Sequence, residues 1–82
     1  RGGKFMQTVQ ISLNSIDKVK AFVNAIAQFD FDFDLVSGRY VIDAKSIMGI
    51  FSLDLSKPIT LNIHTDETQD VLGKLSPYLI KE

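Results

Sequence analysis

The sequence has no cysteine, no excess of charge of either sign and no long apolar run. Without cysteine, the chain can form neither a disulfide framework nor a thiolate zinc site. Nine basic and ten acidic residues leave a net charge of −1, so we expect no positive field of the kind that binds nucleic acid. No apolar run approaches the roughly 18 residues of a membrane span, and no signal-peptide layout is present. These absences favour a cytoplasmic protein that contacts neither nucleic acid nor membrane.

The sequence does contain enough apolar surface for a compact core, because 45% of its 82 residues are hydrophobic. This length is near the small end of what folds alone. There is no internal repeat, low-complexity tract or linker. We therefore interpret residues 5–82 as a single domain and residues 1–4 as a flexible lead-in.

The domain begins with an alternating segment and continues with a helical one. From Phe5 to Leu13, the apolar residues Phe5, Val9, Ile11 and Leu13 occur at odd positions, which is typical of a half-buried strand. At Asn14 the period becomes helical, and it stays so to about Gln28. Asn14 is a good N-cap residue, and Asp17 occupies the capping-box position three residues later. The apolar positions of this helix are Ile16, Val19, Phe22, Val23 and Ile26.

The segment FDFDFDLV, residues 29–36, alternates strictly between apolar and acidic residues. Its aspartate spacing also occurs in calcium loops of the EF-hand type, which need glycine at the sixth position and glutamate at the twelfth. Leu35 and Val41 occupy those positions here. We therefore predict a strand rather than a metal site. We expect Phe29, Phe31, Phe33 and Leu35 to face the core and Asp30, Asp32 and Asp34 to face water.

Turn and capping residues delimit the remaining elements. Ser37-Gly38 forms a two-residue turn into Arg39–Ala44, which predicts a hairpin. Ser46 can cap a short helix by accepting a hydrogen bond from the backbone N–H of Met48 or Gly49. The complete predicted order is strand, helix, strand, strand, short helix, strand, helix.

The last strand and the last helix are also marked in the sequence. Residues 59–64 alternate between apolar and polar side chains after Pro58 and predict the last strand. Asp66 is the expected cap of the final helix, with Gln69 in the capping-box position. Pro77 ends or kinks this helix at Ser76.

The segment KSIMGIFSLDL, residues 45–55, is unusually apolar for a small domain. Ile47 and Ile50 are expected to point inward from the short helix, which leaves Met48 and Phe51 without a place in the core. Apolar side chains of this kind commonly mark a surface that binds a partner. The alternative is that all the apolar residues of the segment pack inside. The residues alone do not decide between these interpretations.

Residues 45–53, KSIMGIFSL, closely resemble the regulatory-serine segment of HPr, the histidine-containing phosphocarrier protein of the bacterial sugar phosphotransferase system. The resemblance continues without a gap from about Phe5 to Leu55, and the last strand and helix follow. It implies an α+β fold, the open-faced β-sandwich, in which a four-stranded antiparallel sheet carries three helices on one face. The element order derived from the residues agrees with this fold.

The chain departs from the HPr pattern at the start of the first helix. In HPr-like proteins that helix begins with a histidine that carries the phosphoryl group, followed by an arginine and a proline. Those places hold Ser15, Asp17 and Lys18 in this sequence. Imidazole is a nucleophile near neutral pH, whereas a hydroxyl needs an adjacent base and forms a phosphate ester too stable to pass on. The only histidine, His64, is in no corresponding motif, and we interpret it as a lone surface residue.

The resemblance implies a regulatory or interaction protein without phosphocarrier activity, and not an enzyme or a cofactor-binding protein. Ser46 is the candidate phosphorylation site; the alternative is that it is a helix cap and nothing more. The implied partners are an HPr-kinase-like enzyme, a transcriptional regulator or a component of the phosphotransferase system. A second possibility is a small protein- or ligand-binding domain that uses the same scaffold without phosphorylation. The expected partner-binding residues are Ile47, Met48, Phe51, Ser52, Leu55, Ser15 and Lys20.

Overall fold

The computed structural model describes residues 6–65 and 69–80. Within these ranges, seven elements follow one another in the predicted order of strand, helix, strand, strand, helix, strand, helix. Three predictions lie outside the described residues: the flexible lead-in at residues 1–4, the start of the first strand at Phe5, and the Asp66 cap.

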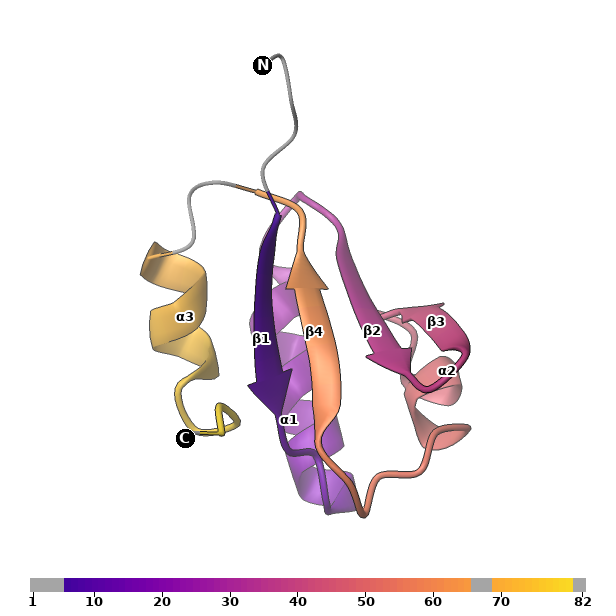
Figure 1. Ribbon diagram of the computed structural model, residues 1–82. Coiled ribbons are helices and arrows are strands. Elements are labelled where there is room, and N and C mark those ends of the chain that lie inside the picture. Colours follow the sequence, from indigo (N-terminus) through magenta and orange to yellow (C-terminus); the bar gives the residue numbers. More distant parts are fainter. Residues whose placement is uncertain (1–5, 66–68, 81–82) are drawn as a thin grey trace.

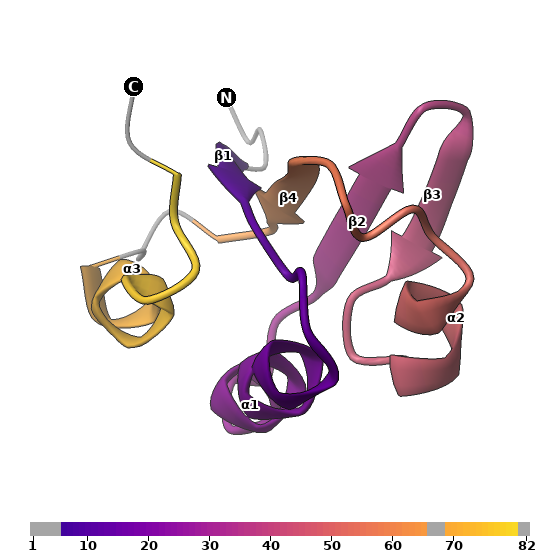
Figure 2. The same cartoon turned by 90° about the horizontal axis from the view of Figure 1, so that it is seen from below.

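The four strands form one antiparallel sheet in the order β1-β4-β2-β3 (Figure 1). The three helices lie side by side on one face of this sheet, and the other face is open (Figure 2). This arrangement confirms the predicted α+β fold with a four-stranded sheet and three helices. The elements are β1 (Gln7–Ile11), α1 (Ile16–Ala27), β2 (Phe33–Ser37), β3 (Tyr40–Asp43), α2 (Ile47–Phe51), β4 (Ile59–Ile63) and α3 (Gln69–Leu75).

The alternation of β4 separates the two faces of the sheet. Its isoleucine and leucine residues are buried under the helices, whereas Thr60 and Asn62 lie on the open face. There, Thr8 Oγ1 donates to Asn62 Oδ1 (2.9 Å) and Gln10 Nε2 donates to Thr60 Oγ1 (2.7 Å). These cross-strand pairs fix the register of β1 on β4. The core between sheet and helices consists of Ile11, Leu13, Val19, Phe22, Ile26, Phe33, Leu35, Ala44, Ile50, Leu53, Ile59, Leu61, Ile63, Val71, Leu75 and Tyr78.

The cap of α1 is Ser15 and not Asn14. Ser15 has an extended backbone (φ −148°, ψ 157°), and its Oγ accepts from the backbone N–H of Lys18 at 3.1 Å. Asn14 is exposed one residue outside the helix. Since Lys18 occupies the third helical position, Asp17 is not in a capping-box position. It lies in the first turn, where an acidic side chain still complements the helix dipole.

The second strand is shorter than its alternation predicts, because β2 begins at Phe33 and not at Phe29. A strand continues only where a neighbouring strand pairs with it. Within the described residues, the pairing of β2 with β4 starts at Phe33, opposite Ile63, and His64 N donates to Asp32 O (3.0 Å) just before it. The preceding residues therefore connect α1 to the sheet without pairing. Phe29 and Phe31 stack on each other there, with ring centroids 5.5 Å apart, and both are half-buried against the core.

The hairpin turn consists of Gly38 and Arg39, one residue later than predicted. Ser37 pairs with Tyr40 as part of the ladder, and Gly38 adopts φ 60°. A positive φ at the first central position matches the right-handed twist of the two strands, and glycine reaches it without steric cost.

The C-terminal segment after α3 returns to the sheet. α3 ends at Leu75, two residues before Pro77. Beyond it, Ser12 N donates to Tyr78 O (2.9 Å) and Ile80 N donates to Gln10 O (3.0 Å), so this segment lies along the outer edge of β1. No helix within the described ranges is long and apolar enough to cross a membrane.

Candidate functional site

Ser46 begins α2, as the sequence predicts. Its backbone is extended (φ −94°, ψ 103°), and its Oγ accepts from the backbone N–H of Gly49 at 3.2 Å. Its own backbone N–H donates to the carbonyl oxygen of Asp43 at 3.0 Å. The residue is exposed. The hydroxyl is therefore a helix cap, and it belongs to a residue that is exposed at the surface.

α2 presents two apolar side chains to solvent. Ile50 is fully buried and Ile47 is half-buried, whereas 79% of Met48 and 41% of Phe51 are exposed. The expected exposure of Met48 and Phe51 is confirmed. Because the two exposed side chains are three residues apart, they lie on the same side of the helix.

The remaining residues expected at this surface follow α2 directly. Ser52 is exposed, and its Oγ donates to the carbonyl oxygen of Gly49 at 2.6 Å. Leu55 is half-buried against the core. Ser52 is therefore more accessible to a partner than Leu55.

Gly49 lies where α2 approaches β3 closely. A Cβ atom at this position would lie 3.2 Å from Ile42 Cδ1 and 3.3 Å from Ser46 Oγ. The glycine therefore lets the helix pack on the strand while the serine keeps its capping geometry.

Lys45 precedes Ser46 in the sequence, but its ammonium group contacts the segment before β2. Its Nζ donates to the carbonyl oxygen of Phe29 at 2.6 Å and lies 5.7 Å from the centroid of the Phe33 ring. These contacts tie the connection between α1 and β2 to the start of α2. Sequence reasoning did not find this contact, because nothing in the local pattern signals a pairing sixteen residues apart.

Ser15, Asp17 and Lys20 lie at the start of α1, which runs beside α2 on the same face of the sheet (Figure 2). All three residues are exposed. Ser15 Oγ is engaged with Lys18 N, so the start of each helix is capped by its own serine. The structure thus places all the predicted partner-binding residues on two adjacent helices and the residues that follow α2.

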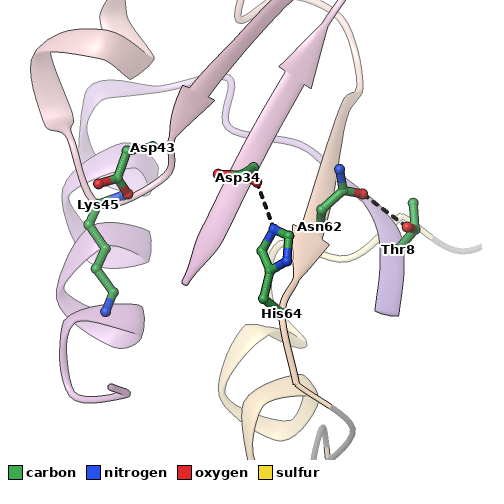
Figure 3. A network of polar contacts seen from close by, with 6 residues as sticks. All are labelled: Thr8, Asp34, Asp43, Lys45, Asn62 and His64. Atoms are coloured by element: carbon green, nitrogen blue, oxygen red, sulfur yellow. Dashed lines mark hydrogen bonds and ion pairs between the residues drawn. The ribbon is translucent and has the colours of Figure 1, made fainter. Parts of the chain in front are cut away.

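His64 is not the lone surface residue that the sequence suggests. Its Nε2 lies 2.7 Å from Asp34 Oδ2, and its side chain is 34% exposed. The pair lies on the open face of the sheet, on the opposite side from α1 and α2, as seen with its neighbours Thr8 and Asn62 in Figure 3. The contact between His64 and Asp34 could have been predicted only from the alternating patterns of β2 and β4 together with the register in which the two strands pair, and the sequence does not give that register.

The surroundings of His64 are acidic. Asp32, Asp34 and Asp43 line the same shallow depression as the histidine. Their carboxylates oppose the approach of an anionic phosphoryl donor. Within residues 6–65 and 69–80, no group of three or more histidine, cysteine or acidic side chains is arranged to hold a metal ion.

The fold and the capped serine define the class of protein: a small α+β domain with an exposed serine at the head of an apolar helix. The family model described as the PTS HPr component phosphorylation site matches residues 17–79, which is more than three quarters of the chain. The chain belongs to the HPr family. Searches of curated proteins and of solved structures found no match. The match begins at Asp17 and so leaves Ser15 outside it.

Proposed function

We propose that this chain is a cytoplasmic regulatory or interaction protein related to the bacterial sugar phosphotransferase system, and that it does not relay phosphoryl groups. The observation that carries the proposal is Ser15. By the resemblance of the sequence to HPr, this residue takes the place of the phosphocarrier histidine, and its hydroxyl caps α1 by accepting from Lys18 N at 3.1 Å.

The chemistry of Ser15 argues against a relay. A hydroxyl must lose its proton to a base before it attacks phosphorus. The nearest carboxylate in sequence is Asp17, but residues two apart on a helix do not face each other. Its negative charge also opposes an incoming phosphate. A serine phosphate, once formed, is a stable monoester and does not pass on its group as a phosphoimidazole does.

Ser46 is the proposed switch. Phosphorylation would add a charge of about −2 at the N-terminus of α2, where the backbone N–H groups and the helix dipole favour an anion. Lys45 is bonded to the carbonyl oxygen of Phe29 and does not need to move. The modification would therefore change the charge beside Met48 and Phe51 while the fold stays intact.

The proposed docking surface consists of Ile47, Met48, Phe51, Ser52, Leu55, Ser15 and Lys20. Met48 supplies a flexible, polarisable contact of the kind that adapts to a partner. Partners of this class are an HPr-kinase-like enzyme, a transcriptional regulator or a component of the phosphotransferase system.

The test is incubation of the intact chain with HPr kinase and ATP, followed by mass spectrometry. We expect one acid-stable phosphate on Ser46, none in Ser46→Ala, and an unchanged yield in the control Ser76→Ala, which removes an exposed hydroxyl just after α3 and outside the docking surface. Circular dichroism should show that both variants fold. No phosphate on the intact, folded chain would favour a binding domain that uses the scaffold without phosphorylation.

A further inference from the structure

The two edges of the sheet are unequal. The outer edge of β1 is occupied by the C-terminal segment, through Ser12 N to Tyr78 O (2.9 Å) and Ile80 N to Gln10 O (3.0 Å). β3 forms the other edge and pairs only with β2 within the described part of the chain. In Figure 2 it is the outermost strand, at the opposite end of the molecule from α3. One edge is thus closed by the chain itself and the other is open.

The backbone of β3 offers hydrogen-bonding groups outward. Tyr40 pairs with Ser37 directly across the two-residue turn, and Ala44 N donates to Phe33 O at 2.9 Å. In an antiparallel ladder, alternate residues direct their N–H and C=O groups to the same neighbour. The even-numbered residues therefore bond to β2, and the N–H and C=O groups of Val41 and the N–H of Asp43 point away from the sheet.

The open edge is also apolar. Tyr40 is 69% exposed and Val41 is 64% exposed, and β3 contains neither the lysine nor the proline that commonly protects an edge strand. Met48 of the neighbouring α2 is also exposed. Gly49 faces Ile42 of β3 and Ile50 is buried in the core, so at about 100° per residue the side chain of Met48 points away from the core. These residues are three of the six large hydrophobics exposed within the described ranges.

We propose that β3 pairs with β3 of a second copy of this chain, antiparallel about a two-fold axis at Val41. The charges favour this occupant and this register. Pairing Val41 with its own copy places Arg39 of each chain opposite Asp43 of the other, which gives two opposite-charge pairs. Asp43 Oδ1 accepts from Lys45 N (2.9 Å), which leaves Oδ2 for the arginine. Centring the axis on Ile42 would instead place Arg39 opposite Lys45, with like charges facing each other.

The resulting dimer has one continuous eight-stranded sheet with α2 of both copies beside the seam. A four-residue strand with a few apolar side chains makes an interface at the small end of specific interfaces, so association is expected at about 0.1–1 mM. The proposal does not depend on phosphorylation of Ser46.

Sedimentation equilibrium over this concentration range tests the proposal. The association constants of variants in which the charges of Arg39 and Asp43 are reversed singly or exchanged are compared with that of the wild type. Arg39→Asp places like charges opposite each other twice and should lower the association constant by about tenfold or more. Asp43→Arg should do the same, and the double change Arg39→Asp with Asp43→Arg should restore association to within about threefold of wild type. Lys74→Glu, the same change of charge on α3 at the far end of the sheet, should have no such effect.

Amide hydrogen exchange of the unmodified chain identifies the surface independently of any variant. Exchange at Val41 and Asp43 should slow as the concentration rises, whereas exchange at exposed amides of α3 should not. A chain that stays monomeric to 1 mM, a dimer that leaves Val41 unprotected, or a double swap that fails to associate while still folded would each overturn the proposal.

Discussion

At the residue scale, Ser15 and Ser46 make the same contact: each hydroxyl accepts from the backbone N–H three residues later. This contact satisfies one of the N–H groups that a helix start leaves without a partner. The sequence identified Ser46 as a cap but placed the cap of α1 one residue too early, at Asn14. Asparagine and serine are almost equally good caps, so local chemistry could not choose between adjacent positions.

Gly49 and Ile42 form a pair whose coupling can be measured. Gly49→Ala gains helix propensity but brings a Cβ to 3.2 Å from Ile42 Cδ1. Ile42→Val removes that atom. We therefore expect Gly49→Ala to be more favourable in the Ile42→Val background than in wild type, by about 0.5–1 kcal/mol. Urea denaturation of the four proteins gives the coupling free energy, and strict additivity would contradict the close contact.

Asp54 allows a prediction of pH dependence just after α2. Its Oδ1 accepts from Ser56 Oγ (2.6 Å) and Ser56 N (3.1 Å), and these bonds lower the pKa of Asp54 from its ordinary 3.8. A carboxyl with a lowered folded-state pKa stabilises the fold above its unfolded pKa, and this contribution is lost as the pH falls through the folded pKa. Ser56→Ala should raise the pKa of Asp54 toward 3.8 in an NMR titration. An unchanged pKa of Asp54 would show that the Ser56 hydroxyl is not the main cause of the lowered value.

At the scale of elements, periodicity together with turn and capping residues identified the helices and strands, but not all their ends. Strict alternation at residues 29–36 predicted a strand throughout, yet β2 begins at Phe33. The reason is topological, because a strand continues only while a neighbour is present, and the sequence does not say how far β4 extends. The partner of His64 was missed for the same reason: Asp34 becomes its neighbour only in the folded register.

Two phenylalanine variants test where β2 begins. Phe33 is fully buried, so Phe33→Ala should cost about 3–5 kcal/mol in free energy of unfolding. Phe31 is half-buried in the connection before β2, so Phe31→Ala should cost clearly less. Chemical denaturation of both variants measures the difference. Equal losses would indicate that the strand extends back through residue 31.

At the scale of the whole molecule, the proposed docking surface and the only histidine of the sequence lie on opposite faces of the sheet. The family and the fold follow from the pattern of the entire chain, which is why both could be predicted. The function of Ser15 and Ser46 is less constrained, since one hydroxyl can cap a helix with or without accepting a phosphate. The sequence pattern locates these serines but does not determine their chemistry.

The switch proposed for Ser46 should act on binding and not on stability. Ser46→Asp, a partial mimic of the phosphate, places its charge at the favourable end of α2 and should change the free energy of unfolding by no more than about 1 kcal/mol. Its effect on affinity for a docking partner should be far larger, as titration calorimetry would measure. Loss of the native circular dichroism spectrum in this variant would contradict a switch that leaves the fold intact.

We expect phosphoryl transfer to this chain only when both the nucleophile at position 15 and the charge at position 17 are changed. Ser15→His restores an imidazole but leaves Asp17 opposing the phosphate, so we expect little transfer to this variant. Ser15→His with Asp17→Arg should accept more, as measured by acid-labile phosphate after incubation with Enzyme I and phosphoenolpyruvate. Equal transfer to the single and double variants would show that Asp17 does not obstruct the site.

The same incubation of the unmodified chain tests the central claim most directly. With Enzyme I and phosphoenolpyruvate, and an HPr that carries the histidine as positive control, this chain should gain no acid-labile phosphate. Acid-labile phosphate on any of its residues, His64 included, would contradict the conclusion that it does not relay phosphoryl groups.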